Sequence, residues 1–499
     1  MSLKTLALAT VCAFGLGVPA QAADVADDRA QAVAAQLRRF LAGILTDQVK
    51  IPADLMTVAP VGEAYTITLR SADNAVARSD SAGTPTTAWV TATVRPAEGT
   101  RWRIDSLLFP AAMRLSPDTA NAIAGLVPKD TATTGLAPSL EWRVRSQSAS
   151  GMFDTALATD SWLEFQMDGV AYDAKNFGSG PDSQMTVDRI AGRYLMRPIK
   201  TGGVDYSGEA TVDGYASISG NPDVGPIRFK TRHATARGEV RSVMFGQFGD
   251  LIRTAVALGL DASTAKTQDE KAARLAMRGM IGALRGIMTG ARMEEVFEGV
   301  EVEATGGYGT ADRLGVAFGG EAQGDTMKVF MEISVGGLKI AGLPAEAADL
   351  VPRSFGVRPS VTNIDIKALT ELADDALMDD ADPDEMKERL MALLTIGGVR
   401  FGFEHLDLDM GYASLTGSGE ATVVGPNAFQ GTADIAVDGF DALMRRAQTL
   451  PNPAQTMAML ALAKGFGKAQ GDKTVWHIAF SPDNKVLING IDIMGRKKH

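Results

Sequence analysis

The spacing of hydrophobic residues divides the chain into a short helical segment and a long strand-rich remainder. Over residues 28–45, Val33, Leu37, Phe40 and Ile44 recur at the 3.6-residue period of an amphipathic helix. Beyond this segment, hydrophobic and polar residues often alternate one by one, as they do in strands that bury a single face. The pattern predicts an α+β fold in which antiparallel β-sheet predominates and helices pack on the sheet.

Alternation near the N-terminus predicts a small antiparallel β domain that follows the helix. Residues 118–138 are rich in Thr, Ala, Pro and Gly and show no strand period, so we place a domain boundary near residue 135. The two predicted domains are residues 23–135, with the helix and the small sheet, and residues 136–499, which are β-rich. The strands expected in the first domain are residues 65–70, 90–94 and 101–105.

The sequence pattern of the larger domain predicts many further strands and three helical regions. Its clearest local signal is at the C-terminus, where residues 474–480 and 485–493 flank Ser481-Pro482-Asp483-Asn484. These four residues have the chemistry of a tight turn, so the segment predicts a β-hairpin. The helices are expected near residues 245–293, 366–394 and 438–468.

A short internal repetition runs through the larger domain. The sequence Gly-Glu-Ala-Thr-Val occurs at residues 208–212 and 419–423, and Gly-Glu-Ala occurs between them at residues 320–322. Each copy leads, after one or more strands, into a strand that turns directly into a helix. Two interpretations stay open: a duplicated unit of strands closed by a packing helix, or chance identity in a chain rich in Gly and Ala.

The first 22 residues predict a secretory signal peptide. Lys4 precedes an apolar run over residues 6–18, and Ala20-Gln21-Ala22 offers small residues for cleavage. The run is too short for a transmembrane helix, and charges interrupt every later apolar stretch, so we expect no membrane-spanning segment after cleavage. Cys12, the single cysteine, lies in this segment. The mature chain would then lack thiol catalysis, disulfides and Cys-zinc sites.

Charge and motifs narrow the function classes further. Asp and Glu outnumber Lys and Arg by 60 to 49, a net charge of −11, which does not supply the positive field that nucleic acids require. His405, Asp407 and Asp409 would share one strand face and could hold a metal, but they also fit the outward polar face of a strand. His477 fits a hydrogen-bonded structural histidine. We assign no catalytic, cofactor-binding or metal-binding residue, and we expect no cofactor.

The predicted helix over residues 269–293 carries the most informative surface. One side is apolar and rich in methionine, while arginines recur every seven residues along another side. This pattern is typical of an ordinary amphipathic helix with a solvated arginine edge. A second hypothesis is an adaptable cover over an apolar groove, whose arginines meet anionic headgroups or an acidic partner. The candidate residues are Met277, Met280, Leu284, Met288, Arg278, Arg285 and Arg292.

The last hundred residues resemble a known family. Gly397-Gly398-Val399-Arg400-Phe401, Gly419-Glu420-Ala421 and Ala433-Asp434-Ile435-Ala436-Val437 are similar to the exported, mostly alphaproteobacterial family called domain of unknown function 2125. A looser similarity extends to envelope proteins of the YdgA and AsmA-like type. The resemblance covers about residues 160–495 and implies a periplasmic location and an elongated, strand-rich architecture. It carries over no catalytic residue.

Three function classes remain. The leading hypothesis is a non-enzymatic periplasmic protein that binds lipid or another apolar ligand, or that acts in cell-envelope maintenance. The second is a structural or protein-interaction module of the periplasm, whose sheet is closed around its own side chains and which contacts an envelope protein. The third is a hydrolase that uses carboxylates, since such sites leave little trace in one sequence.

Overall fold

The computed structural model divides the chain into two compact units, which we call unit 1 and unit 2. Unit 1 comprises residues 1–268 and 286–288, and unit 2 comprises residues 269–285 and 289–499. The predicted signal peptide and the residues 245–288 lie outside the described part of the chain. The structure describes residues 30–35, 56–70, 76–79, 88–115, 139–175, 182–200, 202–220, 225–244, 289–343, 348, 350–375, 383–425, 428–449, 453–483 and 485–493.

The described part of unit 1 is built from antiparallel strands, several of which are unusually long. Their bounds are β1 (Met56–Val61), β2 (Ala64–Arg70), β3 (Val76–Ser79), β4 (Ala88–Pro96), β5 (Arg101–Leu108), β6 (Ala112–Leu115), β7 (Ser139–Asp154), β8 (Ser161–Lys175), β9 (Ser183–Pro198), β10 (Val204–Ser219) and β11 (Ile227–Val243).

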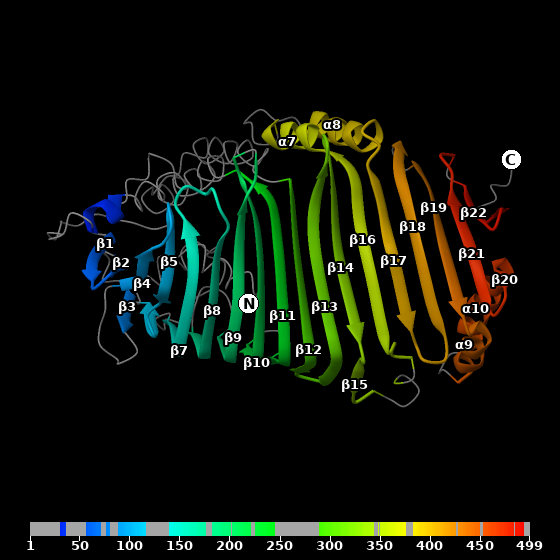
Figure 1. Ribbon diagram of the computed structural model, residues 1–499. Coiled ribbons are helices and arrows are strands. Elements are labelled where there is room, and N and C mark those ends of the chain that lie inside the picture. Colours follow the sequence, from blue (N-terminus) through cyan, green and yellow to red (C-terminus); the bar gives the residue numbers. More distant parts are fainter. Residues whose placement is uncertain are drawn as a thin grey trace. The chain divides into compact units, whose positions relative to one another are not determined.

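Neighbours in sequence are mostly neighbours in the sheet of unit 1. The strands pair in the order β1-β2-β4-β5-β7-β8-β9-β10-β11, and β7 to β11 lie side by side in Figure 1. β5 and β6 both pair with β7, at opposite ends of that long strand, and β3 pairs with β6. The expected boundary near residue 135 therefore does not coincide with the division between the compact units, because one sheet continues across it.

The N-terminal core confirms the predicted helix where it is described and all three predicted strands of that region. Residues 30–35 are helical, and Ala30, Val33 and Ala34 are buried against the sheet. The ring of Trp102 lies edge-on to that of Tyr65 and stacks on that of Phe153. The hydrophobic period of 3.6 followed by a period of two thus gives a helix packed on a sheet. The buried strand residues of this core are Met56, Val58, Tyr65, Val94 and Trp102.

Cross-strand glycines let large rings lie flat on one face of unit 1. The rings of Phe165, Tyr194 and Tyr206 stack across β8, β9 and β10 with centroid separations of 5.4 and 5.7 Å. A Cβ placed on Gly208 would lie 2.6 Å from the ring of Tyr194, and one on Gly192 would lie 2.6 Å from that of Phe165. Burial raises the pKa of Tyr194 and of Tyr206. Glycine in the repeated Gly-Glu-Ala-Thr-Val sequence at residue 208 thus makes room for an aromatic neighbour.

Unit 2 contains twelve strands in its described part. Their bounds are β12 (Gly290–Ala304), β13 (Gly307–Gln323), β14 (Thr326–Gly336), β15 (Lys339–Ala341), β16 (Ser354–Asp365), β17 (Arg400–Asp409), β18 (Ser414–Gly425), β19 (Ala428–Asp438), β20 (Lys468–Gln470), β21 (Lys473–Phe480), β22 (Val486–Ile488) and β23 (Ile491–Asp492).

The strands of unit 2 pair antiparallel in the order β12-β13-β14-β16-β17-β18-β19-β21-β22-β23. The short strands β15 and β20 extend the pairing along β13 and β21. The prediction of an α+β fold dominated by antiparallel sheet is confirmed in both units. The Gly-Glu-Ala-Thr-Val copies lie within β10 and β18, and both interpretations of the repeat stay open.

Four helices of unit 2 fall in two of the regions where the sequence predicts them. They are α7 (Ile366–Asp375), α8 (Pro383–Thr395), α9 (Phe440–Ala447) and α10 (Pro453–Phe466). Phe440 at the start of α9 packs on Trp476 of β21, and the indole N–H of Trp476 donates to the carbonyl of Ala463 at 2.8 Å. Among the described helices, none has the length and apolar character needed to cross a bilayer.

The predicted C-terminal hairpin is confirmed, but its second strand is shorter than expected. β21 pairs with β22, with Phe480 opposite Val486. The expected strand over residues 485–493 is wrong as one piece, because Asn489 and Gly490 adopt left-handed backbone angles (φ 50° and 87°) and turn the chain back into β23. Two successive residues with positive φ form a tight turn that Asn-Gly favours.

A buried carboxylate organises the turn between β7 and β8. Asp154 is 1 % exposed and accepts hydrogen bonds from the Thr100 hydroxyl, from the backbone of Ala156 and Ala158, and from the backbone and hydroxyl of Thr159. Burial opposes its ionisation, but the hydrogen bonds outweigh that effect and lower the pKa of Asp154 to about 2. A carboxylate with so many donors is stabilised in its charged form.

We expect Asp154→Asn to remove both stability and its pH dependence. A pKa lowered from 3.8 to about 2 corresponds to about 2 kcal/mol of folding free energy, present above the unfolded pKa and lost as pH falls through the folded one. Urea unfolding of the native chain and the variant across that pH range measures the difference. Asp160→Asn, at an exposed position of the same loop, is the matched control and should change little. A native-like pH profile for Asp154→Asn would contradict the assignment.

We also expect Gly419→Ala to destabilise unit 2 by about 1–3 kcal/mol, the usual cost of overpacking. A Cβ there would lie 2.7 Å from the Cβ of Ala433 and 3.0 Å from the carbonyl of Thr432, so rigid atoms on the paired strand would have to move. Gly336→Ala is the control, because no atom lies within 4 Å of its added Cβ. Equal midpoints for the two variants in thermal unfolding would refute this packing argument.

Candidate functional site

One face of the unit 2 sheet, which we call the apolar face, is hydrophobic across most of its width; its two central rows end at polar residues, Glu295 opposite Val316 at one edge and Thr474 opposite Val437 at the other. Directly paired residues of antiparallel strands point to the same side, so the register identifies the members of each face. Two rows of paired hydrophobic residues cross the sheet, one from β12 to β19 and the other from β13 to β21. They are Phe297, Leu314, Val335, Phe355, Leu408, Leu415 and Val437, and Val316, Ile333, Val357, Leu406, Gly417, Ile435 and Trp476.

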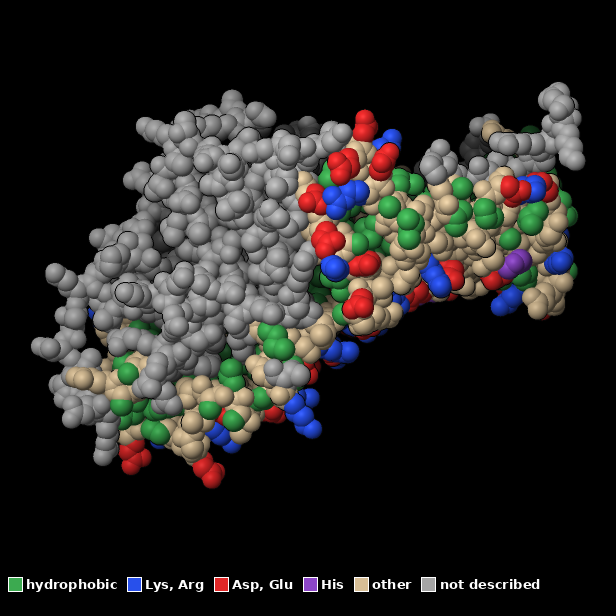
Figure 2. Space-filling view, turned by 90° about the horizontal axis from the view of Figure 1, so that it is seen from above, with side chains coloured by type: hydrophobic (Ala, Val, Ile, Leu, Met, Phe, Trp, Pro, Cys, Tyr) green, Lys and Arg blue, Asp and Glu red, His purple; other side chains and the backbone are tan. Residues whose placement is uncertain are grey.

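The apolar face is covered at one end and exposed in its middle. α9 and α10 pack over β18, β19 and β21, where Val437 and Trp476 are buried. Phe318, Met331 and Phe401 lie outside this cover and remain 36 %, 46 % and 41 % exposed. Figure 2 shows hydrophobic side chains gathered along one side of this sheet and charged side chains along the other. Among the described residues, the middle of the face therefore presents a continuous apolar surface to its surroundings.

The opposite, polar face of unit 2 carries a half-buried network of charges. Glu404 of β17 lies 2.5 Å from the Lys328 ammonium and 3.2 Å from Nε of Arg358. Arg358 also approaches Glu332 at 3.8 Å, and its guanidinium lies 4.2 Å from the ring centre of Phe330. Arg358 Nε makes no hydrogen bond at this geometry, so its attraction to Glu404 is electrostatic. Burial opposes ionisation of Glu404, yet the Lys328 hydrogen bond and the neighbouring cations together lower its pKa.

Unit 1 presents two ladders of alternating charge on its own polar face. In the first ladder Glu164, Arg193, Glu209 and Arg237 follow one another across β8 to β11. Opposite charges on neighbouring strands stabilise their register. The carboxylate of Glu164 lies 3.5 Å from the Arg193 guanidinium. The second ladder consists of Asp168, Arg189, Asp213 and His233, with 2.6 Å between the Asp213 carboxylate and the His233 ring.

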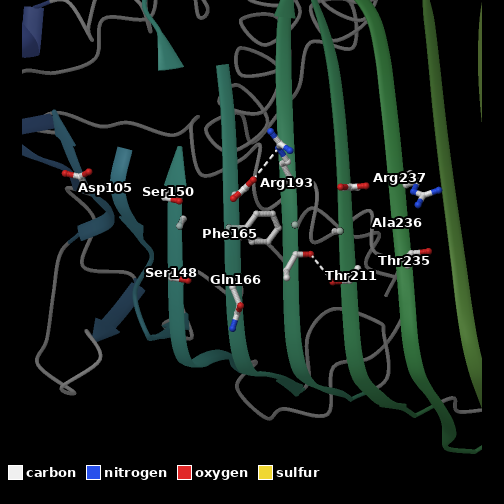
Figure 3. A pocket seen from close by; sticks show the side chains of 16 residues that line it. Asp105, Ser148, Ser150, Phe165, Gln166, Arg193, Thr211, Thr235, Ala236 and Arg237 are labelled. Carbon is white, nitrogen blue, oxygen red and sulfur yellow. Dashed lines mark hydrogen bonds and ion pairs between the residues drawn. The ribbon is translucent and has the colours of Figure 1, made fainter. Parts of the chain in front are cut away.

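Small polar residues fill the row between the two ladders. Ser148, Gln166, Thr211 and Thr235 lie in one row across β7 to β11, with Ala191 of β9 between Gln166 and Thr211, and they border a shallow depression of about 640 Å³ (Figure 3). The charged residues of the first ladder and Ala191 of β9 also line it. The guanidinium of Arg189, in the second ladder, donates to the side-chain carbonyl of Gln166 at 2.8 Å and so links this row to that ladder. The depression offers hydrogen-bonding groups but no concentrated charge.

A second depression, of about 430 Å³, lies on the polar face of unit 2 and contains three carboxylates. Glu404 is paired with Lys328, Glu420 lies 3.6 Å from Arg400, and Asp434 accepts from the His477 ring at 2.8 Å. A hydrolase of the two-carboxylate type needs one carboxyl that stays protonated. The cations around Glu404 lower its pKa, and the other two carboxylates are also paired, so this arrangement suits a structural ladder better than acid catalysis.

Most of the residues proposed from the sequence as an interaction face lie outside the described residues. These are Met277, Met280, Leu284, Met288, Arg278 and Arg285. Arg292 is described, and its predicted helical state is wrong: it lies in β12, opposite Gly319, with its guanidinium 3.4 Å from Glu294. Residues two apart share a face in a strand, which explains this contact. The predicted end of the helix at Met293 is wrong for the same reason, because β12 begins at Gly290.

The histidines behave as members of strand faces. The register confirms that His405, Asp407 and Asp409 lie on one face of β17, where a bulge at residues 404 and 405 puts two successive polar side chains on the same side. Among the described residues, no group of three His, Asp or Glu side chains is placed to share a metal ion. His477 is hydrogen-bonded to Asp434, as expected of a structural histidine.

Comparisons with known proteins give no relative. Neither protein-family models, nor curated proteins, nor solved structures match this chain.

Sequence reasoning missed the charge ladders, although the signal for them is present. Glu164, Gln166 and Asp168 occupy every second position of β8, and Arg189 and Arg193 lie four residues apart, on one face of β9. The matching of opposite charges becomes visible only once the register of the two strands is known.

We expect Glu404→Gln to destabilise unit 2 by about 1 kcal/mol, because it leaves half-buried Arg358 with only the more distant carboxylate of Glu332. Since the pKa of Glu404 is lowered, its contribution is present above the unfolded pKa and is lost on acidification. Glu420→Gln is the matched control: both partners of that pair are more than half exposed, so a few tenths of a kcal/mol are expected. Denaturant titrations at neutral and acidic pH measure the free energy of unfolding of both variants. Equal losses of stability would show that the half-buried network contributes no more than an exposed ion pair.

Proposed function

We propose that this protein is a non-enzymatic periplasmic protein that binds lipid or another apolar ligand on the apolar face of unit 2. The observation that carries the proposal is the exposure of Phe318, Met331 and Phe401 in the middle of a face whose central strands are hydrophobic. Contiguous apolar patches of this kind are uncommon on monomeric proteins and usually mark a binding surface.

The chemistry of the face indicates the class of ligand. Between their ends the paired rows contain aliphatic and aromatic side chains; their hydrogen-bonding side chains are Glu295 and Thr474 at the two edges and the indole of Trp476, which is already bonded to Ala463. A ligand there would gain free energy by removing hydrocarbon from water, at about 25 cal/mol per Å². Adjacent strands are about 4.8 Å apart, so an extended acyl chain lying across several strands would contact one residue after another. Long hydrocarbon chains fit this surface better than compact polar metabolites do.

Two observations favour this function over its alternatives. A sheet sealed by its own helices would suit a pure interaction module, but α9 and α10 cover the end of the face where Trp476 lies and leave Met331 exposed. A carboxylate hydrolase would need a free acid, whereas the carboxylates of the polar depression all face cations or a histidine. The periplasmic location rests on the export signal read in residues 1–22.

The experiment is extraction of the mature protein, purified from the periplasm without detergent, followed by mass spectrometry of the organic phase. We expect roughly one lipid per chain, and we expect Met331→Glu with Phe401→Glu to lower that ratio about tenfold, because buried charge opposes hydrocarbon contact. Ile396→Glu is the matched control, since this residue is 87 % exposed and lies after α8 rather than on the sheet.

A clean extract from the native protein would refute the proposal. So would a double variant that keeps the native lipid ratio while retaining the native unfolding midpoint. An unrelated periplasmic protein purified in parallel sets the background.

A further inference from the structure

α10 has hydrophobic residues on both of its sides. The helix runs from Pro453 to Phe466, and no charged residue occurs before Lys464. A surface helix normally has one polar side, and a helix that is apolar all round is normally buried. α10 has no such polar side, and it is not buried either, because none of its residues is fully buried.

The inner side of α10 is fixed to the sheet. Leu460, Ala463 and Phe466 pack against the core formed by Val437, Phe440 and Trp476. The Trp476 N–H bonds to the carbonyl of Ala463, and Asn489 donates to the carbonyl of Phe466 at 2.7 Å. These contacts set which side of the helix points outwards.

The outer side of α10 is apolar and exposed. Met459 and Leu462 are 60 % and 63 % exposed, the highest values among the large hydrophobic residues of the described helices. Ala458 and Ala461 beside them are exposed as well, and Gln455 is the polar residue on that side. The surface is thus nearly free of hydrogen-bonding groups over three turns.

Cations are concentrated around this helix. Residues 440–473 contain five Lys and Arg against two Asp, in a chain whose net charge is −11. Arg445 on α9 and Lys468 after α10 are exposed. Lys464 pairs with Asp441, which fixes α10 against α9. The local excess of positive charge is opposite in sign to the rest of the protein.

We propose that the outer side of α10 docks on the surface of an anionic membrane. An exposed apolar helix side flanked by cations is the arrangement that binds the headgroup region of anionic lipids. A second copy of this chain is disfavoured, because a two-fold contact through α10 would bring the same cations together. An acidic protein is disfavoured because the outer side offers only Gln455 for hydrogen bonds, whereas protein interfaces combine apolar contact with many such bonds.

This docking is separate from ligand binding on the sheet. α10 would hold the protein at a bilayer, whatever the apolar face of unit 2 carries. The two proposals can therefore fail independently.

The test is cosedimentation of the mature protein with vesicles of phosphatidylcholine containing about one-third phosphatidylglycerol, beside vesicles of phosphatidylcholine alone. We expect binding to the anionic vesicles that weakens with added salt, and little binding to the neutral ones. Met459→Ser with Leu462→Ser should weaken binding about tenfold or more, because the apolar contact is lost. The same variant should keep its co-purified lipid ratio.

Ile396→Ser is the matched control, an exposed apolar residue outside α10, and it should bind as the native chain does. Both variants change exposed side chains, so equal thermal midpoints verify their folding. Unchanged vesicle binding by the α10 variant would overturn the proposal, and so would equal binding to neutral vesicles. A native dimer in light scattering that this variant dissociates would instead assign α10 to self-association.

Discussion

In an antiparallel sheet, directly opposed residues point to the same side, and this constraint determines both faces of each sheet. Once β13 pairs with β14 in the observed register, Val316 and Ile333 must share one face, and Ala317 and Glu332 must share the other. A shift by one residue would exchange the faces of a whole strand. The two faces of unit 2 therefore separate into mostly hydrocarbon on one side and mostly charge on the other, with Glu295 as an exception at the β12 edge of the apolar face.

This separation leaves each face with a different requirement. The charged side chains of the polar faces pair with one another. Carboxylates and cations alternate across neighbouring strands, as in the cross-strand row Glu164, Arg193, Glu209 and Arg237. The apolar face of unit 2 cannot satisfy itself in this way, because hydrocarbon gains only by leaving water. α9 and α10 remove part of it from water near Trp476. The exposed remainder is the reason to expect an apolar ligand.

Local pattern predicted the strands well and the interruptions in them poorly. Tyr65, Ile67 and Leu69 alternate as expected in β2, because each residue reports its own side of the sheet. The turn at Asn489-Gly490 was missed, although Asn-Gly is a strong hairpin signal, since the hydrophobic run on either side masked it. The sequence pattern predicts a helix at Arg292 because the methionine-rich apolar side and the seven-residue spacing of the arginines continue up to the first residues of β12. Both errors concern where an element ends.

The functional surface was harder to predict than the fold. Alternation shows that β13 and β14 have one apolar face, but exposure of Phe318 and Met331 depends on which other segments pack there. The bulge at Glu404 and His405 likewise follows from pairing with both neighbouring strands, not from the local sequence. The sequence-based hypothesis of an apolar ligand rested on a helix whose key residues lie mostly outside the described part. The observed face supplies a different basis for the same proposal.

The most direct test compares two neighbouring positions on opposite faces of the sheet. Phe401 is paired with Val361, so Ser360, one residue along β16, points to the polar face. The single native cysteine is Cys12, within the predicted signal peptide, so a chain produced from residue 23 onwards that carries Phe401→Cys or Ser360→Cys can be labelled with a fluorophore at one site. We expect nitroxide-labelled stearic acid to quench the label at position 401 at saturable, micromolar concentrations and to leave the label at position 360 unchanged. Equal quenching at both positions, or none at position 401, would contradict the account.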